Sequence, residues 1–93
     1  MNETALRYFR VEAKELVAEL EAGLLAYEQS PEVLPDLFRL AHTLKGSARV
    51  VRREAIADLA HAMEDVLAYH REAGSRLAKQ EVMELLGIVD GAV

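Results

Sequence analysis

The sequence contains no cysteine and no tryptophan, and its 93 residues include only two prolines and five glycines. Without cysteine there is no disulfide framework, no thiol nucleophile and no thiolate metal site, so a reducing, cytoplasmic setting is expected. No apolar run approaches the roughly 20 residues that a membrane-spanning helix needs, and the acidic start of the chain does not resemble a secretory signal. We therefore expect one small domain, residues 1–93, without a membrane partner.

A surplus of positive charge is also missing, because 11 Lys and Arg residues stand against 16 Asp and Glu and give a net charge of −5. Binding to nucleic acid requires a cationic surface that neutralises phosphates, so nucleic acid is not an expected partner. One segment is an exception. Residues 39–53 hold five of the basic residues and no acidic one, which leaves the rest of the chain at a net charge of −10.

Apolar side chains recur at steps of three and four residues in four segments, which is the spacing of amphipathic helices. The four apolar stripes cover Leu6–Tyr27, Leu34–Val51, Ile56–His70 and Val82–Val89. Short connections separate these segments, and antiparallel neighbours are the simplest way to pack helices joined in this manner. The sequence predicts an all-α fold, an antiparallel up-down four-helix bundle.

Polar residues and prolines mark where the first two helices begin. Asn2 or Thr4 can cap the first helix, since both side chains accept hydrogen bonds from free backbone N–H groups. Ser30 is placed as the N-cap of the next element, with Pro31 at its first helical position. Pro35 removes a further backbone donor, so the regular second helix is expected to begin between residues 33 and 36.

The last two helices have less distinct boundaries. The third helix is expected to start near Glu54 and to end at Gly74, where a left-handed glycine cap belongs. His70 lies in line with its apolar stripe near the helix C-terminus, which favours a structural role for this histidine. The fourth helix is expected to run from Ala78 to about Asp90.

A histidine on the second predicted helix carries the main chemical signal. His42 lies about 120° from the apolar stripe and therefore points toward solvent. Lys45 and Gly46 follow it by one turn and Arg49 by two turns on the same side. A neutral imidazole is a competent nucleophile toward phosphorus, and Lys45 and Arg49 can offset the charge of the resulting phosphoramidate. The missing side chain at Gly46 would let the phosphorylated group of another protein approach.

A second pair of polar residues, His61 and Glu64, lies beside the apolar stripe of the third predicted helix. If the second and third helices are antiparallel neighbours, Glu64 comes within reach of His42. A carboxylate that accepts a hydrogen bond from one ring N–H fixes the tautomer and makes the other nitrogen a better nucleophile. On its own, however, the pair can also be an ordinary surface contact between residues three positions apart.

Two other interpretations of these residues remain open. The chain can be a helical interaction module without chemistry, in which His42 is an ordinary surface histidine. It can also be a metal-binding helical bundle that uses His42, His61 and Glu64. Against the metal, di-metal bundles use Glu-x-x-His pairs whereas the order here is His-x-x-Glu, and the nearby cations repel a metal ion.

Two segments resemble a known family. Residues 41–48 read AHTLKGSA and residues 59–67 read LAHAMEDVL. Together they resemble the histidine phosphotransfer (HPt) domains, and most closely the N-terminal phosphoacceptor domain of chemotaxis-type histidine kinases. The resemblance extends over nearly the whole chain. It implies that His42 is phosphorylated on the ring nitrogen remote from the backbone.

The resemblance also implies roles for neighbouring residues. Glu64 would hold the other ring nitrogen, and Lys45 would assist the phosphate. Gly46 would give clearance, and His61 would belong to the surrounding hydrogen-bond network.

This sequence departs from the family pattern directly after the motif. Where the family has small residues and glycine, residues 49–53 of this chain read RVVRR. If a left-handed residue is needed at that turn, an arginine there costs about 1 kcal/mol relative to glycine. The additional cations Arg39, Arg49 and Arg53 are expected to select the acidic partner that docks.

The resemblance implies a phosphocarrier that takes a phosphoryl group from ATP through a separate kinase domain. The carrier would then pass this group to an aspartate of a response-regulator receiver domain. The sequence has no G-x-x-x-x-G-K-[ST] loop, so we expect no cofactor or metal in this domain, and ATP and Mg²⁺ would belong to the kinase. The domain alone would have no turnover. Its parent would be a multidomain histidine kinase of which this chain is the N-terminal part.

Overall fold

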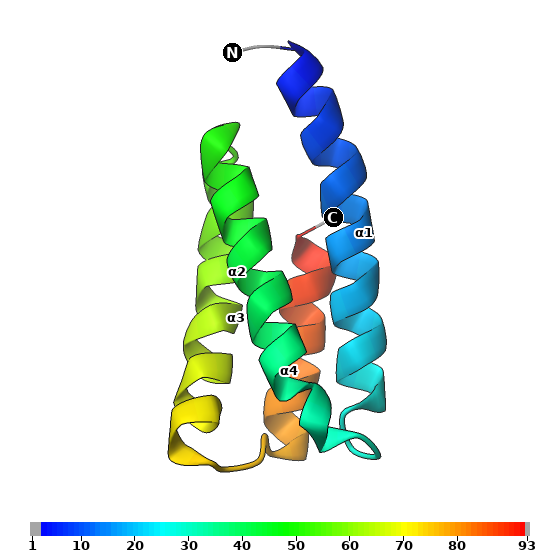
Figure 1. Cartoon of the computed structure of the whole chain (residues 1–93), viewed down its shortest axis with the longest axis vertical. Coiled ribbons are helices and arrows are strands. Elements are labelled where there is room, and N and C mark those ends of the chain that lie inside the picture. Colours follow the sequence, from blue (N-terminus) through cyan, green and yellow to red (C-terminus); the bar gives the residue numbers. More distant parts are fainter. Residues whose placement is uncertain (1–2, 93) are drawn as a thin grey trace.

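The computed structural model describes residues 3–92 and contains four α-helices in this range (Figure 1). The helices are α1 (Glu3–Ala26), α2 (Leu34–Val50), α3 (Glu54–Ala73) and α4 (Lys79–Gly91), and the 3₁₀ turn η1 (Pro31–Val33) precedes α2. Successive helices run in opposite directions and pack against each other, and α4 also packs against α1. The predicted all-α, antiparallel up-down bundle is confirmed. Within the described residues, no helix has the length and apolar character needed to cross a membrane.

The starts of the helices differ in detail from the predicted caps. Thr4 lies inside α1, so the prediction that it caps this helix is wrong, and Asn2 lies outside the described residues. Ser30 occupies the predicted N-cap position before Pro31, but its side chain makes no capping hydrogen bond. Pro35 stands in the first turn of α2, where a missing N–H group costs nothing because the first backbone donors have no partner within the helix.

Two residues in the left-handed region end the helices that carry the site. Gly74 closes α3 with a φ angle of 67°, as predicted. Arg52 closes α2 with a φ angle of 58°. The N–H groups of Arg52 and Arg53 donate to the carbonyls of Arg49 and Ala48 at 3.1 and 2.8 Å, the pattern of a Schellman cap. An arginine therefore stands where glycine is the strain-free choice.

The core lies between the inward faces of all four helices. Its largest fully buried side chains are Leu20, Leu37, Leu44, Met63, Leu67, Leu85 and Val89. Gly23 permits the close approach of α1 to α2, because a Cβ atom at this position would lie 2.6 Å from Cδ2 of Leu37. The apolar stripes therefore pack as the periodicity predicts, which holds α2 and α3 side by side along their length.

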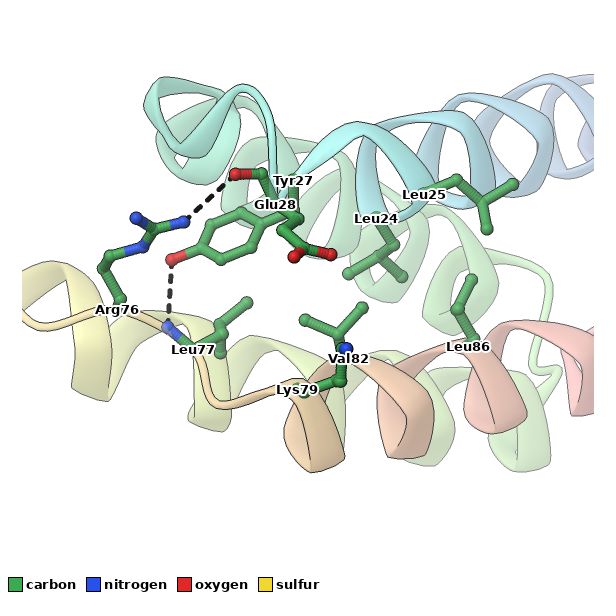
Figure 2. A pocket seen from close by; sticks show the side chains of 9 residues that line it. All are labelled: Leu24, Leu25, Tyr27, Glu28, Arg76, Leu77, Lys79, Val82 and Leu86. Atoms are coloured by element: carbon green, nitrogen blue, oxygen red, sulfur yellow. Dashed lines mark hydrogen bonds between the residues drawn. The ribbon is translucent and has the colours of Figure 1, made fainter.

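At the end of the bundle where α3 connects to α4, polar groups fasten the connection to the end of α1. The hydroxyl of the buried Tyr27 accepts a hydrogen bond from the N–H of Leu77 at 2.9 Å (Figure 2). The guanidinium of Arg76 donates to the carbonyl of Glu28 at 3.2 Å. A pocket of about 300 Å³ separates this end of α1 from the start of α4. Tyr27 therefore also satisfies a buried backbone donor, in addition to its packing role.

His70 joins α3 to α4 and has the structural role that the sequence favoured. Its side chain is 12% exposed, and its Nε2 and Nδ1 atoms lie 2.8 Å from Glu81 Oε2 and from Ser75 Oγ. Glu81 also accepts a hydrogen bond from the N–H of Ala78 at 2.8 Å. The bonds from Ala78 and His70 lower the pKa of Glu81 below its ordinary value of 4.5.

Candidate functional site

His42 lies at the middle of α2 and its side chain is 63% exposed. Its ring stacks on the ring of Phe38, one helical turn earlier, with the centroids 6.1 Å apart and the planes 12° from parallel. Nδ1 forms a hydrogen bond with Oε2 of Glu64 on α3. No described residue forms a hydrogen bond with Nε2. The ring is thus held on one edge by protein groups and is open to solvent on the other.

Glu64 is the one buried charged residue in the described part of the chain. Its Oε2 atom accepts the hydrogen bond from His42, and its Oε1 atom accepts one from Nζ of Lys45. A carboxylate can only accept hydrogen bonds, so the ring proton of a neutral His42 belongs on Nδ1. This arrangement depends on α2 and α3 being antiparallel neighbours, because their packing brings together residues 19 and 22 positions apart.

The charge on Glu64 follows from its hydrogen bonds. Burial alone would raise the pKa of this carboxyl group, but the bonds from Lys45 and His42 outweigh burial, and the pKa lies below its ordinary value of 4.5. Glu64 is therefore a carboxylate at neutral pH. It holds the Nδ1–H tautomer of His42, which leaves the lone pair of Nε2 facing outward.

Lys45 and Gly46 follow His42 by one helical turn and differ in their surroundings. The side chain of Lys45 is only 14% exposed, because it lies against the bundle and bonds to Glu64. Gly46 is exposed, and a Cβ atom built there would meet no atom within 4 Å. The internal packing of the chain therefore does not require glycine at position 46, and any need for clearance must come from outside the domain.

His61 faces a different set of partners from the one the sequence suggested. Its Nδ1 atom lies 3.5 Å from the guanidinium of Arg49, and its Nε2 atom lies 3.4 Å from Asp65, one turn further along α3. The surface pair of His61 with Glu64 is not formed, because Glu64 points inward to His42. His61 is thus connected to the basic flank of α2 through Arg49.

The three arginines expected at a partner surface occupy different places. Arg39 lies one turn before His42, is exposed, and has Asp36 at 3.9 Å. Arg49 lies two turns after His42 on the same helix and contacts His61. Arg53 is at the N-cap position of α3, beyond the end of α2. Arg39 and Arg49 therefore flank the imidazole, and Arg53 stands further away at the tip of the bundle.

Two further residues, Phe38 and Arg71, lie at the site although neither was predicted as a site residue. Phe38 belongs to the apolar stripe, yet its ring also forms a platform for His42. The guanidinium carbon of Arg71 on α3 lies 4.0 Å from the centroid of the Phe38 ring. The spacing of Phe38 four residues before His42 was visible in the sequence, whereas the contact with Arg71 requires the register of two helices.

The described part of the chain does not bring His42, His61 and Glu64 together as ligands of one metal ion. No group of three His, Asp or Glu side chains converges there as a metal site would require. The proposed ligand His61 contacts Arg49 and Asp65, while His42 and Glu64 bond to each other. These three residues therefore do not form one ligand set.

An exposed imidazole, held by a buried carboxylate on a four-helix bundle, is the arrangement that the resemblance to the histidine phosphotransfer domains led us to expect. The Hpt domain family model matches residues 4–92. The chain belongs to the Hpt domain family.

Proteins similar to this chain include chemotaxis proteins from several organisms. The chemotaxis protein CheA of Treponema pallidum is 41% identical over 69 residues, which cover 71% of this chain and 8% of that protein. The chemotaxis protein CheA of Halobacterium salinarum is 35% identical over 89 residues, or 92% of this chain and 13% of that protein. The gliding motility regulatory protein of Myxococcus xanthus is 34% identical over 74 residues, or 77% and 10%. This chain thus spans about a tenth of the length of these relatives, and no solved structure shows a significant match.

Proposed function

We propose that this chain is the phosphoacceptor domain of a chemotaxis-type histidine kinase and that His42 carries the phosphoryl group. The observation that supports this most strongly is the 63% exposed ring of His42, whose Nδ1 atom is held by the buried carboxylate of Glu64. The similarity to CheA proteins over most of the chain supports the chemotaxis assignment.

The first transfer uses the lone pair of Nε2. This lone pair attacks the γ-phosphorus of ATP held by a separate kinase domain, an N–P bond forms, and the P–O bond to ADP breaks. Positive charge develops on the ring during the attack, and the Glu64 carboxylate stabilises this charge through the Nδ1–H bond. In the second transfer, a receiver aspartate attacks the phosphorus, and the N–P electron pair returns to Nε2.

The basic residues beside His42 complement the charge of the carried phosphoryl group. Lys45 stands one turn away and already neutralises Glu64, while Arg39 and Arg49 flank the ring on the surface of α2. A positive rim on an acidic domain should guide an acidic receiver to the site and make the encounter sensitive to salt. The open space at Gly46 leaves room for the approaching partner.

The remaining parts of the relay would lie elsewhere in a longer, cytoplasmic protein and its receiver. The matched segments make up only 8% and 13% of these relatives, which supports a parent kinase with a separate ATP-binding domain. ATP and Mg²⁺ would bind to that domain. This domain would then act as substrate and carrier, without turnover of its own.

The test is phosphorylation by a cognate kinase domain with ATP and Mg²⁺. We expect an acid-labile, alkali-stable phosphate that is absent from His42→Gln, with the helical circular dichroism signal unchanged. His70→Gln is the matched control, because His70 pairs with Glu81 at the far end of the bundle, and it should retain the phosphate. A wild-type chain that takes up no phosphate, or a His42→Gln variant that is labelled normally, would leave a helical interaction module as the better description.

A further inference from the structure

We propose that Arg71 and Phe38 position the phosphoacceptor ring. Arg71 on α3 contacts the face of the Phe38 ring, and the Phe38 ring holds the plane of the His42 imidazole. We call the Arg71–Phe38 contact the clamp. This inference rests on the proposed function and adds two positioning residues to it. Neither residue touches the phosphoryl group, and both would act through His42.

The contacts form a continuous series on the surface of α2 and α3. The guanidinium carbon of Arg71 lies 4.0 Å from the centroid of the Phe38 ring, within the range of a cation–π contact. The Phe38 and His42 rings are 6.1 Å apart between centroids and 12° from parallel, which is an offset stack. Arg71 has no carboxylate within ion-pair distance among residues 3–92, so its charge is directed at the aromatic ring rather than at an acid.

The register of the two helices explains why Arg71 reaches Phe38. Glu64 on α3 lies opposite His42 on α2. Arg71 follows Glu64 by seven residues, or about two turns, and α3 runs antiparallel to α2. Arg71 therefore comes opposite the part of α2 that precedes His42, where Phe38 is placed. The same helix pairing thus brings Glu64 to one edge of the imidazole and the clamp to the turn before it.

Two restraints of different kinds then define the orientation of the ring. The hydrogen bond to Glu64 holds Nδ1, but the ring can tilt about this bond, and tilting weakens the bond that keeps the proton on Nδ1. The stack on Phe38 fixes the plane of the ring, and the guanidinium limits the movement of Phe38, whose ring is only partly buried. Together they keep Nε2 directed outward, so that less reorientation is needed for attack on phosphorus.

The experiment measures the tautomer of His42 by ¹⁵N NMR and the rate of phosphorylation by the kinase domain, both on the 93-residue chain. Arg71→Gln should lower the fraction of the Nδ1–H tautomer and slow phosphorylation by about two- to fivefold, the factor expected for an exposed cation–π contact. Arg76→Gln is the matched control, because Arg76 also lies over an aromatic ring, Tyr27, at 5.8 Å and far from the site. It should leave both measurements at the wild-type level. Equal slowing in the two variants would overturn the proposal.

A double-mutant cycle and a conservative variant separate stacking from simple charge. If Arg71 acts through Phe38, Arg71→Gln should have no further effect in a folded Phe38→Leu background. An undiminished effect there would contradict the proposal. Arg71→Lys keeps the charge but replaces the flat guanidinium, so its rate should fall between the wild type and Arg71→Gln. A wild-type rate for Arg71→Lys would show that charge alone matters and would refute the clamp.

Failure of the proposed phosphoacceptor function and failure of the clamp give different experimental results. A wild-type chain that takes up no phosphate contradicts the proposed function, and the His42 tautomer in the Arg71→Gln spectrum still tests the clamp. A wild-type chain that is phosphorylated normally, together with an Arg71→Gln variant of the same rate and tautomer, contradicts the clamp alone.

Discussion

Replacement of Glu64 by glutamine would move the ring proton of His42 from Nδ1 to Nε2 without changing the shape of the site. Glu64 presents two acceptor oxygens, one to His42 Nδ1–H and one to the Lys45 ammonium. Glutamine offers one acceptor oxygen and one NH₂ donor. The two partners must then compete for a single oxygen.

Lys45 should win this competition. A hydrogen bond that involves a charged group contributes about 1.5–3 kcal/mol, compared with about 0.5–1.5 kcal/mol for a neutral pair. The amide oxygen therefore turns to Lys45, and the NH₂ group faces Nδ1 of His42. Nδ1 must then accept, which moves the ring proton to Nε2 and removes the lone pair that attacks phosphorus. A difference of about 1 kcal/mol corresponds to an approximately fivefold preference for the unreactive tautomer.

The loss of negative charge slows the reaction further. Phosphoryl transfer places positive charge on the imidazole, and only the carboxylate gives a charge-assisted bond to the Nδ1–H group. Loss of a contribution of about 1.5–3 kcal/mol corresponds to a rate that is about 10- to 150-fold lower. The helices should stay intact, because the substitution preserves the volume of a side chain that is only 10% exposed.

The assay is the initial rate of phosphate incorporation with a cognate kinase domain, together with ¹⁵N NMR of the His42 ring. Glu81→Gln is the matched control, since Glu81 also pairs with a histidine, His70, at the far end of the bundle. It should leave the rate unchanged. A Glu64→Gln variant that is phosphorylated within twofold of the wild-type rate would refute the assignment of Glu64 as the residue that holds the tautomer.

Three further predictions concern the free energy of unfolding. Gly46→Ala should raise it by about 1 kcal/mol, because alanine favours helix and its Cβ meets open space; a decrease in a urea titration would contradict this. Arg52→Gly should raise the free energy of unfolding by up to about 1 kcal/mol, because glycine adopts a φ angle of 58° without strain. Arg53→Gly should lower it, because the φ angle of Arg53 is −91° and glycine relieves no strain there. Equal shifts of the two variants in thermal melts would exclude strain as the cause. Acidification should also lower the free energy of unfolding. The hydrogen bonds accepted by Glu64 and Glu81 outweigh burial and keep the pKa of each carboxyl group below 4.5. The stabilisation is therefore complete above about pH 4.5 and is lost as the pH falls through the folded-state pKa values. A free energy that stays level from about pH 5 to about pH 3 would argue against both hydrogen-bond networks.

The helices and their inward faces could be predicted because both depend on local spacing. The apolar stripes identified the core, and Gly74 identified the end of α3. The precise cap of α1 could not be located in this way, because Thr4 has the same capping chemistry whether it precedes a helix or lies within it. The left-handed position at Arg52 could only be suspected, since arginine gives no local signal for such a conformation.

The parts of the site on one helix could be predicted directly, whereas the approach of Glu64 to His42 could be predicted only on the condition that α2 and α3 are antiparallel neighbours, as they are. The exposure of His42 follows from its angle to the apolar stripe of α2, whereas its contact with Glu64 depends on the pairing of α2 with α3. The same pairing sends His61 to Arg49 and places Arg71 over Phe38. These cross-helix contacts depend on the register of α2 against α3. Core packing along both helices sets this register, so the local sequence of one helix does not determine it.

The most direct test of the relay is the position of the phosphorus atom on the phosphorylated chain, measured by ³¹P–¹⁵N coupling in NMR. Coupling to Nε2 of His42, with a proton still on Nδ1, is the expected result. Coupling to Nδ1 of His42, or to a ring nitrogen of His61 or His70, would contradict it.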